Sequence, residues 1–236
     1  MNSQLVAMPK AFPNESIWSA SPALHEPRLT ASRIISPPPQ NSEWQPLRQF
    51  WRSAGPEPAF QAGWARITWQ PEQLFYEVIF LGGGARNLAR ALNERTWELG
   101  DICEVFVELA GGPGYVELHV TPENQRLQLL WRPGQFEKFQ AHPEFFSENT
   151  VSDLHWVRSF VFQNPSGWAA SAILPATILG VERLAPTMSL RTAVCRYDCG
   201  SRAEPVLSST AALTFPSYHR RAEWHRLALQ STPPTS

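Results

Sequence analysis

The sequence has little charge, few cysteines and no long apolar run, and each absence narrows what the chain can be. Charged residues make up 17% of its 236 residues, too few for a disordered chain, while hydrophobic residues make up 43%, enough for a packed core. The formal net charge of −1 gives no long-range field that would attract nucleic acid. The sequence contains no run of about 18 apolar residues, the length that could span a bilayer. We therefore expect a soluble globular protein with neither a nucleic-acid nor a membrane partner.

The sequence also has few cysteines and no recognisable secretory signal. The three cysteines, Cys103, Cys195 and Cys199, are too few and odd in number for a disulfide framework, and no metal-ligand spacing accompanies them. We expect plain reduced thiols. The stretch Met1–Lys10 lacks a basic segment followed by an apolar one, so no secretory signal is recognisable. The sequence leaves the location unknown, and the cytoplasm is the default expectation.

Proline and tryptophan, by contrast, are abundant, with 22 and 10 residues. Proline divides a chain into short extended pieces, and tryptophan offers a large flat apolar face with one N–H donor. Residues 1–40 are rich in Pro and Ser and predict an irregular extended N-terminal segment, with Leu29–Ile35 as a candidate edge strand. Residues 41–230 are predicted to form a single domain, and residues 231–236 a disordered tail.

Short β-prone segments separated by turn residues follow one another from Trp64 onward. The expected strands are Ala65–Trp69, Leu74–Phe80, Ile102–Leu109, Tyr115–Val120, Leu127–Trp131, Trp156–Phe162, Trp168–Leu174, Leu190–Tyr197 and Trp224–Leu229. Residues 87–98 have helical composition, and residues 133–153 are the least regular part. The predicted fold is all-β: an antiparallel β-sandwich of two sheets, of the jelly-roll or immunoglobulin-like kind, with an irregular Pro-rich N-terminal extension.

The hairpin Ile102–Val120 can be interpreted in detail, because its apolar residues alternate. Pairing apolar with apolar residues places Leu109 opposite Val116 and Val107 opposite Leu118, with a four-residue loop at Gly111–Gly114. The other face then carries a polar and aromatic set: Glu104, Phe106, Glu108, Tyr115, Glu117 and His119. In this register Glu108 faces Glu117 across the strands. Two facing carboxylates need a cation, an arginine or a hydroxyl-rich ligand. A solvated outer face with local arginine pairs explains the set equally well.

Five segments, in order, resemble the family 9 carbohydrate-binding modules and their DOMON-like relatives. One is the run from Trp97 through Asp101 and Glu104 to Glu108, followed by Gly114–Leu118 and Val120–Asn124. The others are Ala65–Phe80, Gly167–Pro175, Leu190–Asp198, and Phe215–His219 with Trp224–Leu227. The resemblance covers residues 30–230 and implies a β-sandwich that binds a sugar without catalysis, a module of bacterial type whose partner is a mono- or oligosaccharide.

The resemblance also implies a set of site residues. Sugar sites cover the apolar ring faces with aromatic planes and hydrogen-bond the hydroxyl rim. We expect Trp97 to be the aromatic platform, Glu104 an acceptor of hydroxyl protons, and Arg196 and His219 rim contacts. Trp224 is the candidate for a second platform. Three of these residues have a structural alternative: Trp97 as a packing residue that fixes the insert to the sandwich, Arg196 as the partner of an acid, and His219 as a loop residue.

Two departures from the family pattern weaken specific expectations. His225 follows Trp224 where the family has glycine. The acidic stretch after the early strands, near which the family often holds a structural calcium, is here a glycine run and a basic insert, Arg86–Arg95. We therefore expect no cofactor, and calcium is doubtful.

Three further readings compete with the sugar-binding one. A degenerate sandwich that docks a protein partner would explain the replaced glycine. A glycosidase would need an acid–base pair among Glu104, Glu108 and Glu117 held across a cleft. A heme relative would need an axial pair such as His119 with Met8 or Met188 inside a pocket.

Overall fold

The computed structural model describes residues 16–23, 37–38, 43–200, 202 and 204–231. The candidate strand Leu29–Ile35, Met8 and nearly all of the expected tail lie outside the described residues. Within the described part, no helix is both long and apolar enough to cross a membrane.

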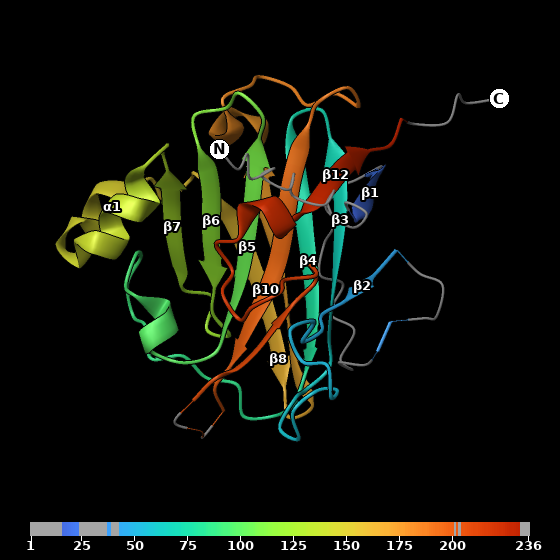
Figure 1. Ribbon diagram of the computed structural model, residues 1–236, viewed down its shortest axis with the longest axis vertical. Helices are drawn as coiled ribbons and strands as arrows, with labels where there is room; N and C mark the ends of the chain where they lie inside the picture. The colour runs from blue at the N-terminus through green and yellow to red at the C-terminus, as the bar shows by residue number, and fades with distance from the viewer. Residues whose placement is uncertain (1–15, 24–36, 39–42, 201, 203, 232–236) are drawn as a thin grey trace, which may run out of the picture.

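The strands form two sheets, as the alternation of short β-prone segments predicted (Figure 1). Sheet A has the order β7 (Arg126–Trp131), β6 (Tyr115–Val120), β5 (Ile102–Leu109), β10 (Leu190–Asp198), β12 (His225–Leu229) and β1 (Ile17–Pro22), with β11 (Val206–Ser209) also on β10. Sheet B has the order β1, β3 (Gly63–Gln70), β4 (Gln73–Leu81), β9 (Gly167–Pro175) and β8 (Arg158–Asn164), with β2 (Gln45–Pro46) on β3.

Strand β1 belongs to both sheets and joins them along one side. Its residues Ile17–Ala20 pair in parallel with β12, and Ser21 and Pro22 pair in parallel with β3. All other strand pairs within the described residues are antiparallel. This strand falls within the segment expected to be an irregular extension, and in the structure it is part of the sandwich.

The helical pieces are short. They are η1 (Thr96–Glu98), α1 (Gln135–Ala141), η2 (Pro143–Asn149), η3 (Ala176–Leu179) and η4 (Arg221–Glu223). Figure 1 shows α1 beside β7 at the edge of sheet A, with the turn η1 (green) below it on the same side. The sequence predicted no regular structure at 133–153, where α1 and η2 form. Gly134, at φ 78°, precedes α1 and lets the chain turn sharply out of β7.

Two apolar clusters stabilise the fold, one on each face of sheet A. The main core lies between the sheets and contains the alternating residues Val105 and Val107 of β5 and Val116 and Leu118 of β6. The second cluster covers the outer face of sheet A and includes Phe106. The face expected to be open is therefore largely buried: Glu104, Glu117 and His119 are only 3%, 4% and 1% exposed.

The register of the β5–β6 hairpin differs by two residues from the predicted one. Val107 pairs with Val116 and Glu104 with His119, whereas the predicted pairs, Val107 with Leu118 and Glu108 with Glu117, are wrong. Because a shift of two residues returns every side chain to the same face, alternation predicted the faces but could not choose between these registers. The loop is longer than predicted, and Gly114 leaves it at φ 147° in close contact with the backbone of Trp131.

Candidate sugar-binding pocket

A cavity of about 300 Å³ lies on the outer face of sheet A. Its floor comes from four adjacent strands, and its walls come from η1, α1 and the segment before η4. The lining residues are Trp97, Glu104, Glu117, His119, Leu129, Trp131, Phe136, Phe139, Gln140, Tyr197, Pro216, Ser217, Tyr218 and His219. The volume is at the lower end of the range for small-molecule sites.

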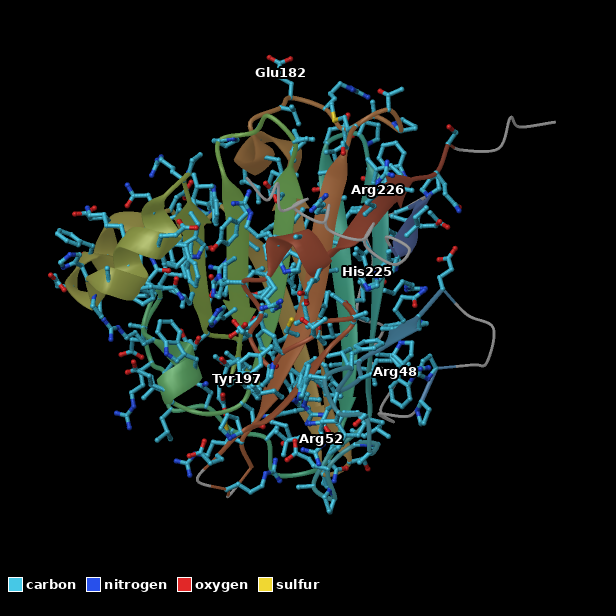
Figure 2. The ribbon with its side chains drawn as sticks, viewed as in Figure 1. Arg48, Arg52, Glu182, Tyr197, His225 and Arg226 are labelled. Carbon is cyan, nitrogen blue, oxygen red and sulfur yellow. The ribbon has the colours of Figure 1, made fainter. Side chains whose placement is uncertain are left out.

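Strand alternation places the floor residues on one face. Glu104 of β5 lies directly opposite His119 of β6 and Cys195 of β10, and Glu117 lies opposite Leu129 of β7. Tyr197 extends the floor along β10 and is labelled near the lower part of that strand in Figure 2.

The insert before β5 positions Trp97. The Asn87 side-chain amide donates to the carbonyl oxygens of Thr96, at 2.8 Å, and Asp101, at 3.2 Å, which closes the loop at both ends of η1. Gly100 passes so close to Arg86 that a Cβ would lie 2.1 Å from the Arg86 carbonyl oxygen. The half-buried Trp97 ring then packs edge-on against His119 and Phe146.

Helix α1 and residues 216–219 form the other walls of the pocket. Phe136 and Phe139 are three residues apart and so lie on one face of α1, directed at the pocket. The His219 ring stacks on Phe136 with a centroid separation of 3.7 Å and an interplanar angle of 16°. Its Nδ1 atom hydrogen-bonds the Tyr115 hydroxyl at 2.9 Å.

A buried network of two glutamates and a histidine forms the polar part of the floor. The two ring nitrogens of His119 are engaged, Nδ1 with the Thr96 hydroxyl at 2.8 Å and Nε2 with Glu117 Oε1 at 2.7 Å. Glu117 Oε2 accepts from Trp131 Nε1 at 2.5 Å and lies 3.6 Å from His219 Nε2. Glu104 Oε1 lies 3.4 Å from His119 Nε2, beyond normal hydrogen-bond length.

The two carboxyl groups have opposite pKa shifts. Burial raises the pKa of Glu104 to about 8, against the opposing attraction of His119. Burial acts on Glu117 in the same direction, but His219, His119 and Trp131 together hold its pKa below the usual value. Burial lowers the pKa of His119, but the two glutamates outweigh it and the net shift is upward. Burial lowers the pKa of His219. Near neutral pH these shifts favour an ionised Glu117, a protonated Glu104 and a neutral His219.

Glu104, Glu117 and His119 are also the group of potential metal ligands that converge in the described residues, with ligand atoms within 4.8 Å of one another. The 2.7 Å separation between His119 Nε2 and Glu117 Oε1 is a hydrogen-bond length, which a shared proton explains. We therefore describe the group as a proton-linked network.

The calcium that the family resemblance implies does not fit the residues around the insert. Asp101 accepts backbone N–H groups from Arg86 and Cys199, and Glu123 accepts that of Asn87. These carboxylates already hold donors, so they do not present the set of free oxygen ligands that calcium requires.

Of the five site residues expected from the sequence, the structure brings three together. Trp97, Glu104 and His219 come from three separate segments and line the same pocket. Trp224 does not: it is 3% exposed, packs on Phe106 and donates from Nε1 to a backbone carbonyl oxygen at 2.8 Å.

Arg196 lies on the opposite face of sheet A from Glu104. Its guanidinium is buried between the sheets over the ring of Phe80, 4.9 Å from the centroid, and 3.6 Å from Asp198. The sequence contained the signal, since Arg196 is an even number of residues from Leu190 and Val194, which face the main core.

Several pocket residues were not predicted as binding residues. Trp131 was predicted as the last residue of a strand, yet its indole forms part of the pocket lining while its N–H donates to Glu117. Phe136, Phe139 and Gln140 lie on a helix that the sequence pattern did not predict. The three-residue spacing of the two phenylalanines was the available signal.

Neither a scan of protein-family models nor a comparison with curated proteins finds a match to this chain. Solved structures do match. A proposed carbohydrate-binding protein from Bacteroides uniformis superposes with a TM-score of 0.63 at 16% identity, over 91% of this chain and 98% of that one. A family 9 carbohydrate-binding module from Caldicellulosiruptor kristjanssonii in complex with cellotriose superposes with a TM-score of 0.58 at 12% identity, over 92% of this chain and 94% of that one. A family 9 module from the same organism in complex with glucose superposes with a TM-score of 0.55 at 11% identity, over 92% of this chain and 98% of that one. The chain thus has the β-sandwich fold of the family 9 carbohydrate-binding modules, as the sequence motifs indicated.

Proposed function

We propose that this chain is a carbohydrate-binding domain that holds a sugar in the pocket on the outer face of sheet A. The observation that carries the proposal is the convergence of Trp97, Glu104 and His219 on one cavity of about 300 Å³. Aromatic planes suit the apolar faces of a pyranose, and carboxylate and imidazole groups suit its hydroxyl rim. The size favours one or two sugar rings, and the fold is that of modules solved with glucose and cellotriose.

We propose that binding occurs without cleavage of the sugar and needs no cofactor. Glycosidases place their two carboxyl groups on either side of the scissile bond, about 5 to 9.5 Å apart. Glu104 and Glu117 lie side by side on one sheet face, with ligand atoms and the intervening His119 within 4.8 Å. His119 also has both nitrogens hydrogen-bonded, which does not suit an axial heme ligand.

The test of sugar binding is calorimetry on the full chain with glucose, cellobiose, cellotriose and a panel of other mono- and oligosaccharides. We expect binding of at least one sugar, weakened at least tenfold in Trp97→Ala because the stacking platform is lost. Trp44→Ala is the matched control, since Trp44 is a half-buried tryptophan that packs under Arg66 away from the pocket.

Two results would contradict the proposal. One is no heat of binding with any sugar at millimolar concentration, which would favour a protein-docking module instead. The other is equal weakening by Trp97→Ala and Trp44→Ala, which would place the sugar elsewhere or report a general loss of folding. Release of nitrophenol from an aryl glycoside, lost in Glu104→Gln, would contradict the non-catalytic part.

A further inference from the structure

The ionisable side chains of the pocket are unevenly matched in charge. Two carboxyl groups, Glu104 and Glu117, face two imidazoles, and none of the described lining residues is lysine or arginine. His219 has its pKa lowered by burial and stays neutral near pH 7. The glutamates raise the pKa of His119, so this ring is the one imidazole of the described lining whose surroundings favour the charged form.

The His119 ring already forms its close contact with Glu117. Both ring nitrogens of His119 are engaged, Nδ1 with the Thr96 hydroxyl and Nε2 with Glu117 Oε1, so neither nitrogen is left for a close hydrogen bond to Glu104. Glu117 has a second donor as well, the Trp131 N–H at 2.5 Å. The protein itself therefore supplies the hydrogen-bond donors of Glu117, and among the described residues Glu104 is left without one.

Glu104 is left as a buried carboxyl group without a close donor. Its Oε1 atom lies 3.4 Å from His119 Nε2, and only 3% of the residue is exposed to solvent. A buried carboxylate of this kind needs a cation or a proton. The raised pKa agrees with this, because the carboxyl group keeps a proton where no cation reaches it.

The rest of the pocket also suits a positive charge. Five aromatic side chains line it in addition to Trp97, namely Trp131, Phe136, Phe139, Tyr197 and Tyr218. Aromatic faces attract ammonium groups through the ring quadrupole, most strongly when the groups are removed from water. A ligand anion, in contrast, would meet two carboxyl groups and no arginine or lysine among these residues.

We propose that the preferred ligand is an amino sugar with a free, protonated amine, whose ammonium group pairs with Glu104 on the pocket floor. This inference depends on the proposed sugar-binding function and names the class of sugar. The exchange is balanced: the protonated Glu104 releases one proton to solvent, and the resulting carboxylate pairs with the incoming ammonium.

The experiment is calorimetry on the full chain at about pH 6, where a sugar amine is protonated. Three matched sets are compared: glucosamine, glucose and N-acetylglucosamine, and the corresponding galacto and manno sets. We expect the free amine to bind at least tenfold more tightly than both its hydroxyl and its acetylated counterparts in one set. Titration in two buffers of different ionisation enthalpy is expected to show net proton release for the amine alone.

Two variants separate the ammonium contact from general effects. Glu104→Gln keeps the side-chain shape and removes the charge, so the ratio of amine to hydroxyl affinity is expected to fall to about 1. Glu108→Gln is the matched control: Glu108 lies on the same face of β5 but pairs with Arg221 outside the pocket. It is expected to leave the ratio unchanged.

Each outcome decides between the two proposals. Equal binding of amine and hydroxyl sugars by the native chain, or tighter binding of the acetylated forms, overturns this inference and leaves sugar binding intact. A preference that survives in Glu104→Gln also overturns it. Binding of no sugar at all overturns the proposed function. Where Glu104→Gln fails to fold, the native preference and its proton release decide the matter alone.

Discussion

At the scale of single residues, Glu104 is the most informative position in the molecule. The fold buries a carboxyl group opposite His119 and then uses that histidine to serve Glu117. A buried group in this position lowers stability when ionised, because desolvation penalises its charged form. Sites that bind ligands often keep such groups, since the ligand supplies the missing partner.

The burial of Glu104 predicts how stability depends on pH. Its pKa is raised from 4.5 to about 8, so between these values the folded chain binds a proton that the unfolded chain has released. Stability should therefore fall as pH rises through this window. The raised pKa of His119 acts in the same direction above its ordinary value of 6.5. The pKa of Glu104 is also raised by Glu117, and Glu104 in turn raises the pKa values of Cys103, Cys195, Tyr197 and Tyr218.

Urea unfolding at several pH values between about 5 and 8 tests this prediction. Relative to Glu104→Gln, the native chain is expected to lose up to about 1.4 kcal/mol of unfolding free energy per pH unit, the value for one proton. Glu108→Gln should follow the native chain. Parallel curves for native protein and Glu104→Gln would show that Glu104 titrates normally.

What the sequence could predict also differs from residue to residue. Strand alternation was enough to place Glu104, Glu117 and His119 on one face, because that inference needs only the period of two. It was not enough to tell that this face is covered, since the covering residues, such as Phe136 and His219, come from segments without a β pattern.

At the scale of elements, the pocket depends on short irregular pieces held against regular strands. The floor belongs to sheet A and is fixed by its ladders, but Trp97 sits on η1 within an insert without strand or helix periodicity. The structure fixes this insert through polar contacts of Asn87 and through the close approach of Gly100 to Arg86. These contacts join groups that are several residues apart along the chain. No local sequence pattern indicates them.

Gly100→Ala tests whether the insert positions Trp97. Gly100 has φ 141°, and an added Cβ would meet the Arg86 carbonyl oxygen at 2.1 Å, so the loop must shift. We expect a loss of about 2 to 4 kcal/mol in urea unfolding, together with weaker sugar binding. Gly84→Ala is the control, because Gly84 also has positive φ, 79°, but nothing lies within 4 Å of the added Cβ. It should cost about 1 kcal/mol and leave sugar affinity unchanged. Equal effects of the two would refute the steric argument.

At the scale of the whole molecule, the two sheets are held in one unit by the chain's early strand. Strand β1 pairs with β12 through Ile17–Ala20 and with β3 through Ser21 and Pro22. The sequence predicted a sandwich from the later strands, and the similar structures agree. It did not predict β1, because Ile17–Pro22 has few β-prone residues and lies in a Pro- and Ser-rich stretch. Its pairing is decided by partners some 50 and 200 residues away along the chain.

Two adjacent residues of β1, one buried and one exposed, form a matched pair for mutation. Trp18 is 1% exposed, belongs to the core between the sheets and packs edge-on against His225, whose ring lies 5.4 Å away, whereas Ile17 on the other face of β1 is 64% exposed. Figure 2 labels His225 on β12, next to β1. Trp18→Ala should reduce the free energy of unfolding by about 3 to 5 kcal/mol, and Ile17→Ala should change it by less than about 0.5 kcal/mol. Because the strand closes the sandwich on the side away from the pocket, any Trp18→Ala protein that remains folded should keep its sugar affinity. A small cost for Trp18→Ala would mean that the sheets hold together without β1, and that the early segment only decorates a sandwich completed by the later strands.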